Sequence, residues 1–263
     1  MKSLPVAFYF IMALSAFTSC SSTDPAKQTV SKSYLTKLNL PGDLEDRIQY
    51  SDDTTISQID TYYQGNLLWT NKFQWNADRS LIIYTYNPAG AYTESRKISF
   101  TGGWISGIDI SSASSPLGAA TKNSFSFYLD NQKRLSYYAD VREYYNYPKV
   151  VERGDVTWHS DGLDLSIKDF SGTQTGLYSL HTTGKDTSSP WLKLTPEVKG
   201  IISIDQVHFI HFFVSNTITS MGPYTYDQQM SDAAGNVISI RRTSVSNGSV
   251  DYFKFTWKVV VGK

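Results

Sequence analysis

A two-residue alternation of apolar and polar side chains is the feature that most restricts how this chain can fold. Along Tyr252–Lys258, the apolar residues Phe253, Phe255 and Trp257 occupy every second position. Successive side chains of a strand point to opposite faces, so this pattern predicts an antiparallel strand with one apolar and one polar face. The same pattern predicts strands at three further places: Phe73–Trp75, Phe125–Phe127 and Leu163–Lys168.

Short turns rich in Asp and Asn separate these strands. Asn76–Arg79, Asp130–Lys133 and Asp232–Asn236 each lie between an aromatic strand and an aliphatic strand. Asp and Asn side chains bond to nearby backbone groups, and Gly235 or Asn236 can adopt a positive φ at low cost. Because the turns recur at irregular intervals, the sequence predicts a meander of hairpins and not a propeller or a solenoid.

These signals predict a single all-β domain over residues 34–263, an antiparallel meander that forms a curved open sheet or a partial barrel. The segment Ile201–Val214 carries apolar residues on both faces, which favours a central strand that is covered on both sides. Helix is expected only in short pieces, such as Asp43–Ile48. Gly102–Gly103 and Ser111–Ala120 are expected to be loops.

We expect the N-terminal segment that ends at Cys20 to carry targeting information. Lys2 precedes an apolar run from Val6 to Phe17, which suits a signal peptide and is too short to span a bilayer. The run ends just before Cys20, the one cysteine of the chain, and this arrangement resembles a bacterial lipoprotein signal. We expect residues 1–19 to be the signal peptide, Cys20 to be lipidated and residues 20–33 to be a flexible tether. The alternative is an ordinary secretory signal, which would leave a free thiol in an exported protein.

The C-terminal third contains a Tyr-x-Tyr segment, an Asp-x-x-Gly turn, an aliphatic segment and a final aromatic segment. The residues in this order are Tyr224, Tyr226, Asp232, Gly235, Val237, Ile240, Phe255 and Trp257. This order resembles a β-meander domain of unknown function, with hairpins of a Tyr-Asp type, in lipoproteins of Bacteroides-type bacteria. The resemblance implies a lipid-anchored, all-β envelope protein and brings no established activity.

Charge and motifs exclude several classes of function. With 24 basic against 24 acidic residues and no basic run, the chain is not expected to bind nucleic acid. No phosphate loop, dinucleotide fingerprint or nucleophile elbow occurs, so neither a cofactor nor a catalytic residue is expected. His208 and His211 would lie on opposite faces of a strand, so no metal site is expected. The acidic cluster at Asp43–Asp46 is expected to be a solvated loop.

Tyrosine and tryptophan are unusually frequent, with 18 and 6 copies. Such rings stack on sugars or receive peptides, because each has a flat apolar face and a polar edge. Packing within the sheet explains the same residues equally well. If a ligand surface exists, we expect it near a dense tyrosine cluster, with Trp69 and Trp191 as weaker candidates; the candidate ligand-binding residues are Tyr138, Tyr144, Tyr145 and Tyr147.

We therefore expect a non-enzymatic protein of the outer membrane, held there by lipid on Cys20, that binds a glycan, a peptide or a protein partner. Two alternatives stay open: a polymer hydrolase whose site the sequence does not reveal, and a structural subunit of an envelope assembly. Whether the domain faces the cell surface or the periplasm also stays open. Acidic residues just after the lipidated cysteine can direct export to the surface, and here only Asp24 is of that kind.

Overall fold

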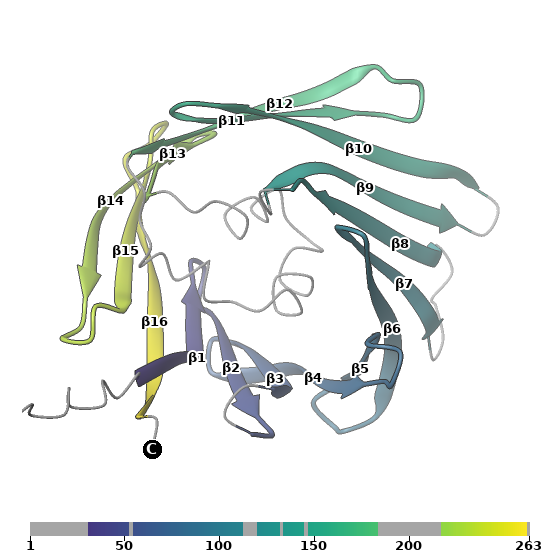
Figure 1. Ribbon diagram of the computed structural model, residues 1–263, viewed down its shortest axis with the longest axis horizontal. Coiled ribbons are helices and arrows are strands. Elements are labelled where there is room, and N and C mark those ends of the chain that lie inside the picture. The colour runs from purple at the N-terminus through teal and green to yellow at the C-terminus, as the bar shows by residue number, and fades with distance from the viewer. Residues whose placement is uncertain are drawn as a thin grey trace, which may run out of the picture.

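The described part of the chain forms a closed antiparallel β-barrel of sixteen strands (Figure 1). The computed structural model describes residues 31–52, 55–112, 120–131, 134–144, 147–183 and 217–261. Each described strand pairs with its neighbours in the sequence, and β1 pairs with β16 to close the sheet. The predicted meander is confirmed.

The strands vary in length from five to thirteen residues. They are β1 (Ser31–Leu40), β2 (Leu44–Tyr50), β3 (Ile56–Tyr63), β4 (Asn66–Trp75), β5 (Leu81–Tyr86), β6 (Tyr92–Thr101), β7 (Trp104–Ser112), β8 (Ala120–Leu129), β9 (Leu135–Tyr144), β10 (Tyr147–His159), β11 (Gly162–Lys168), β12 (Gln174–Thr183), β13 (Thr217–Met221), β14 (Tyr224–Ser231), β15 (Val237–Ser244) and β16 (Val250–Val261).

The expectation of a curved open sheet or a partial barrel is corrected by the pairing of the first and last strands. Their register runs from Ser31 opposite Val261 to Asn39 opposite Lys254. This contact joins segments more than two hundred residues apart, and local periodicity carries no information about such a pairing. Strand β1 also begins at Ser31, within the segment expected to be the tether.

The helix expected at Asp43–Ile48 is absent, because these residues form a turn and then strand β2. Gly42 and Asp43 both have positive φ, 84° and 63°, which ends β1 and reverses the chain. Beyond the turn, exposed Arg47 alternates with buried Asp46 and Ile48, so the segment has a period of two and not of 3.6. The expected strand at Ile201–Val214 lies outside the described residues.

The inner wall of the barrel is mostly apolar. In β11, Leu163, Leu165 and Ile167 are 1%, 0% and 5% exposed, while the alternate positions are only half-buried. Strand pairing carries this face around the barrel, and the predicted apolar faces at Phe125–Phe127 and Phe253–Trp257 belong to it. Its fully buried members are Leu35, Leu38, Ile59, Leu81, Ile98, Leu135, Leu163, Leu165 and Leu180.

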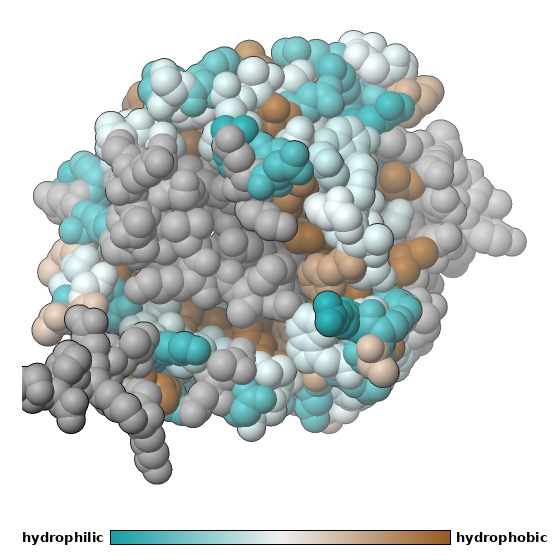
Figure 2. All heavy atoms as spheres, in the orientation of Figure 1, coloured by the Kyte–Doolittle hydropathy of each residue, from teal (hydrophilic) through white to brown (hydrophobic). Residues whose placement is uncertain are grey.

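The outer wall carries charged groups in the middle of its strands. The Glu45 carboxylate oxygens form ion pairs of 2.6 Å with Lys37 Nζ and with Arg47 Nε. Arg241 on β15 makes a two-point contact with Asp227 on β14, at 2.7 and 2.6 Å. Figure 2 shows hydrophilic residues along much of the outer edge and hydrophobic residues farther in. The two faces of the sheet therefore differ in polarity, with charge on the outside.

Two tryptophan side chains donate hydrogen bonds to the first residue of the preceding strand. The indole Nε1 of Trp158 donates to the carbonyl of Leu135 at 2.8 Å, and Trp257 Nε1 donates to the carbonyl of Val237 at 2.7 Å. Both acceptor residues are 0% exposed. Buried carbonyl groups need a partner, so these bonds fix the ends of the β9–β10 and β15–β16 hairpins.

We predict that Trp257→Phe lowers the free energy of unfolding by about 1–2 kcal/mol more than Trp75→Phe does. Trp257 loses a hydrogen bond to a buried carbonyl, whereas Trp75 stacks on Phe100 at 6.0 Å and has no indole hydrogen bond. Urea unfolding of both variants measures the difference. Equal losses would show that the indole bond contributes nothing.

Two glycines on the inner wall make room for aromatic rings. A Cβ on Gly107 would lie 2.1 Å from Phe125, and one on Gly154 would lie 2.0 Å from the ring of Tyr138. Each glycine lies directly opposite the ring's own residue in the strand pairing. Neither glycine has a positive φ. Glycine is therefore required at these two positions because the aromatic ring fills the space of a Cβ, and not because of backbone conformation.

We predict that Gly107→Ala lowers the free energy of unfolding by about 1–3 kcal/mol, because the added methyl group overlaps the Phe125 ring. The double variant with Phe125→Leu should lose less than the sum of the two single variants, since the smaller side chain relieves the overlap. A double-mutant cycle by chemical denaturation tests this. Additive losses would show that the alanine destabilises the barrel by some means other than overlap with the Phe125 ring.

Candidate functional site

Of the tyrosines that the sequence singled out, the structure describes the side chain of Tyr138. It is 5% exposed, faces the barrel interior and donates a hydrogen bond to the Glu152 carboxylate. Burial, together with this bond, raises the Tyr138 pKa above its ordinary value. Tyr144 and Tyr147 pair with each other at the end of the β9–β10 hairpin. Their side chains, and Cys20, Tyr145 and Trp191 entirely, lie outside the described part of the chain.

Tyr137, the neighbour of Tyr138, points to the outside and belongs to a group of three rings that contact one another. Trp104 on β7, Tyr128 on β8 and Tyr137 on β9 lie directly opposite one another in the strand pairing. Ring centroids are 4.9 Å apart between Trp104 and Tyr128, and 6.0 Å apart between Trp104 and Tyr137. Trp104 is 42% exposed. We call these three residues the outer aromatic row.

Sequence reasoning missed Trp104 and Tyr128, although the strand pattern contains a signal for them. Ile105 and Phe127 are buried at 5% and 3%, so the residues beside them must face outward. An aromatic residue out of phase with the apolar face of its own strand therefore marks an exposed ring. That the three rings meet depends on the register between strands, which the pattern does not give. Trp69, a weaker candidate, is 39% exposed on β4.

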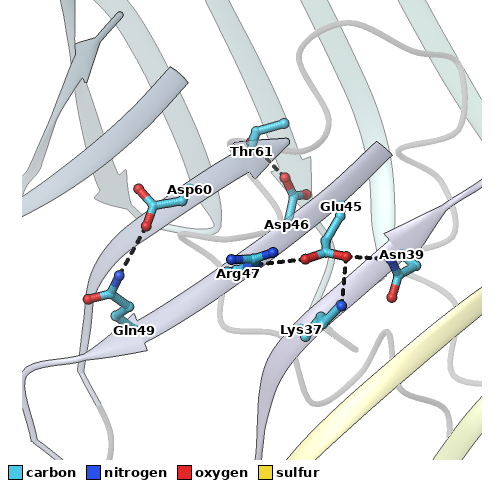
Figure 3. Close-up of polar contacts among 8 residues, drawn as sticks. All are labelled: Lys37, Asn39, Glu45, Asp46, Arg47, Gln49, Asp60 and Thr61. Carbon is cyan, nitrogen blue, oxygen red and sulfur yellow. Dashed lines mark hydrogen bonds and ion pairs between the residues drawn. The ribbon is translucent and has the colours of Figure 1, made fainter. Parts of the chain in front are cut away.

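The acidic cluster is a solvated loop only at Asp43, which lies in the exposed turn, because Glu45 and Asp46 lie on β2 and face opposite sides of the sheet. Asp46 faces inward, is 6% exposed and accepts a hydrogen bond of 2.6 Å from Thr61 Oγ1 (Figure 3). Desolvation raises the pKa of the Asp46 carboxyl to about 6, against the opposing effect of the Thr61 bond. Removing a carboxylate from water disfavours its charged form.

Glu45, the next residue, has the opposite electrostatic environment. Figure 3 shows its carboxylate among Lys37, Arg47 and Asn39, while Asp46 is directed toward Thr61. Desolvation opposes ionisation here too, but the hydrogen bonds from Lys37, Arg47 and Asn39 outweigh it and lower the Glu45 pKa to about 2. Two adjacent carboxyl groups thus differ because one faces the barrel interior and the other faces the outer wall.

Further polar side chains face the inside of the barrel. Thr85 Oγ1 donates to Asn71 Oδ1 at 2.8 Å, between β5 and β4. On the opposite part of the wall, the Arg242 guanidinium lies 4.1 Å from the centroid of the Tyr224 ring and pairs with Asp251 at 2.9 Å. These groups are paired within the wall, so they stabilise it without presenting a reactive centre.

The histidines do not form a catalytic or metal-binding group in the described part of the chain. His159 Nε2 lies 3.0 Å from Asp164 Oδ2, and Ser179 Oγ donates to Asp164 Oδ1 at 2.6 Å. The carboxylate lies between serine and histidine, so the histidine cannot take a proton from the serine as a triad requires. Among the described residues, no group of three or more His, Cys, Asp or Glu side chains is placed to hold a metal ion. His208 and His211 fall outside those residues.

Comparison with known proteins finds likeness only at the level of structure. No protein-family model and no curated protein matches the sequence. A porin-like protein from Bacteroides uniformis aligns over 86% of this chain and 96% of its own, with 10% identity and a TM-score of 0.45. A chain of the TcdB2-TccC3-Cdc42 structure aligns over 83% of this chain but 12% of its own, with 9% identity and a TM-score of 0.28. Scores below 0.5 do not establish a shared fold, so the barrel is defined by its own strand pairing.

In the described part of the chain, the strand pairing and burial define a sixteen-stranded barrel with exposed charges on its outer wall and a mostly apolar inner wall. The described segments include no helix of the length and hydropathy needed to cross a bilayer.

We predict that Asp46→Asn stabilises the protein by about 2 kcal/mol at pH 8 and has little effect at pH 4. Between about pH 4 and pH 6 the folded protein holds the Asp46 proton and the unfolded chain does not, so the wild type loses stability as the pH rises through this range. Asparagine keeps an acceptor for Thr61 and removes the charge. Urea unfolding across this range measures the difference.

Glu45→Gln is the matched control, because it should act with the opposite sign. The Glu45 pKa is lowered, so its charge stabilises the folded state above about pH 4 and this contribution disappears as the pH falls toward 2. If Asp46→Asn were neutral at pH 8, the Asp46 carboxyl would have to be solvated in the folded protein.

Proposed function

We propose that this chain is a lipid-anchored protein of the bacterial envelope whose barrel stands in water and acts as a non-enzymatic binding module. One observation carries the proposal: exposed charged groups lie in the middle of strands on the outer wall, whereas the inner wall is mostly apolar and its charged groups are paired. This is the arrangement of a barrel surrounded by water, since a barrel surrounded by lipid needs an apolar outer band.

The position of the outer charges within their strands supports this proposal. Arg47, Lys72 and Lys254 are exposed and lie near the middle of β2, β4 and β16. A lysine or arginine at the middle of a bilayer on the lipid face of a barrel costs about 2–4 kcal/mol. Several strands are also short for a bilayer, which needs about 9–11 residues: β2 has seven residues, β5 has six and β13 has five.

A lipid on Cys20 would then supply the membrane attachment. Ser31 begins the barrel 11 residues after Cys20, and it pairs with Val261 at the end of β16. A chain of that length reaches at most about 40 Å. The barrel would therefore stay close to the membrane while remaining in water.

Binding is favoured over catalysis because the described residues offer an exposed aromatic group and no activated nucleophile. In the outer aromatic row, Trp104 is 42% exposed, and Tyr128 and Tyr137 are half-buried beside it. The Ser179, Asp164 and His159 contacts are in the wrong order for acyl transfer.

We predict that Cys20→Ala moves the protein from the membrane fraction to the soluble fraction of a Gram-negative host, because the barrel itself does not enter the bilayer. Thr29→Ala, in the same segment, is the control and should stay with the membranes. Carbonate washing and centrifugation of both variants give the measurement, and protease treatment of intact cells shows which side the wild type faces.

Two results would contradict the proposal. If Cys20→Ala resists carbonate extraction, the barrel is embedded in the bilayer by its own wall. If the wild type is already soluble, Cys20 is not lipidated. Cleavage of the wild type on intact cells places the barrel at the cell surface, and protection until the outer membrane is opened places it in the periplasm.

A further inference from the structure

The outer aromatic row lies in a part of the wall that differs from its surroundings. Outward positions on β7, β8 and β9 form a three-by-three arrangement in the strand pairing. None of the nine carries a charge, whereas β10 next to them contributes Arg153 and Asp155, and β6 on the other side contributes Lys97. The nine residues are Trp104, Tyr128 and Tyr137, then Ser106, Ser126 and Ala139, then Ile108, Ser124 and Val141.

The rings of the row are held in place before any ligand arrives. Trp104 contacts both Tyr128 and Tyr137, and the three backbones belong to one continuous sheet. Neighbouring strands lie about 4.8 Å apart, so the three rings extend across roughly 10 Å of the wall. A surface that needs no reordering loses little entropy on binding.

The surroundings of the rings supply hydrogen-bonding groups and one ion pair. Ser106 and Ser126 occupy the next outward positions of β7 and β8. Asp155 lies directly opposite Tyr137 on β10 and pairs with Lys168 at 2.6 Å. Hydroxyl groups beside flat rings suit a ligand that has both apolar C–H faces and hydroxyl groups.

We propose that the outer aromatic row is the binding site for an uncharged glycan chain, with sugar rings stacked on Trp104, Tyr128 and Tyr137. The inference rests on the proposed binding function and names its site and ligand class. A neutral ligand matches a surface whose nine positions carry no charge. A glycan matches better than an apolar partner, because serine hydroxyls lie between the rings and the apolar residues Ile108 and Val141.

The row also explains why adjacent tyrosines differ. Tyr138 fills space above Gly154 on the inner wall, and Tyr137 meets Trp104 on the outer wall. Elsewhere on the outer wall, opposite charges pair across strands, as Arg241 does with Asp227. Trp104, at the β7 end of the row, contacts the rings of Tyr128 and Tyr137 and stays 42% exposed, so a ligand with flat apolar faces would cover it.

The test is affinity electrophoresis of the detergent-extracted full chain through gels that contain a soluble polysaccharide. Neutral β-glucan, xyloglucan, galactomannan and starch are the probes, and polygalacturonate is the charged comparison. A zwitterionic detergent is required, since glycoside detergents would compete for the site. We expect at least one neutral polysaccharide to retard the wild type, and Trp104→Ala or Tyr137→Ala to weaken the retardation at least about tenfold.

Tyr252→Ala is the matched control. Tyr252 is 47% exposed on β16, and its outward neighbour on that strand is Lys254, so its removal should leave retardation unchanged. Thermal unfolding of every variant shows whether the barrel is intact, and Trp104→Phe, which keeps a ring, should retain part of the binding even if Trp104→Ala is less stable.

Three outcomes would overturn the inference. If no neutral polysaccharide retards the wild type, the proposed ligand class is wrong. The proposed envelope function is tested separately, by fractionation of Cys20→Ala. Retardation that Trp104→Ala leaves unchanged removes the site but keeps a glycan-binding function. A wild-type dimer that Trp104→Ala converts to a monomer would assign the surface to contact between copies of this chain.

Discussion

The pairing of β1 with β16 is the interaction on which the rest of the structure depends. It joins Leu38 to Phe255 and Leu35 to Trp257 across the closing seam, so the apolar inner face continues without a break. A sheet of this size without that seam would expose two long edges, which invite pairing with other chains. Closure also gives the sheet an inner and an outer face, and the surroundings of each side chain depend on which of the two faces it lies on.

Once the barrel is closed, the phase of each strand decides what each residue does. Because the side-chain period is two, a shift of one position moves a residue from one wall to the other. Glu45 and Asp46 are adjacent carboxylic acids, yet their pKa values are displaced in opposite directions, to about 2 and to about 6. Tyr137 and Tyr138 are adjacent phenols, yet one contacts Trp104 on the outer wall and the other bonds to Glu152 inside. The protonation behaviour and contacts of these side chains therefore depend on whether they face the inner or the outer wall, and not on the residue type alone.

The polarity of individual strands could be predicted from the sequence, whereas contacts between distant strands could not. Alternation identified the apolar faces of Phe253–Trp257 and Leu163–Ile167, because a strand's two faces are a local property. Closure was not predicted, since the β1–β16 contact joins the two ends of the described chain. A helix was wrongly expected at Asp43–Ile48, where the positive φ of Asp43 and the barrel register override the local composition. Trp104 was missed for a related reason: its exposure is local, but its neighbours come from β8 and β9.

The wall polarity and the outer aromatic row are consequences of one geometry. A strand pairing that places Ile105 and Phe127 inside must place Trp104 and Tyr128 outside, since those residues are their immediate neighbours. Burial of the inner residues then stabilises the same backbone that aligns the outer rings, and the rings can remain exposed without weakening the core. A binding surface on such a wall is set by strand register, so it is as rigid as the barrel itself and needs no loop to order it.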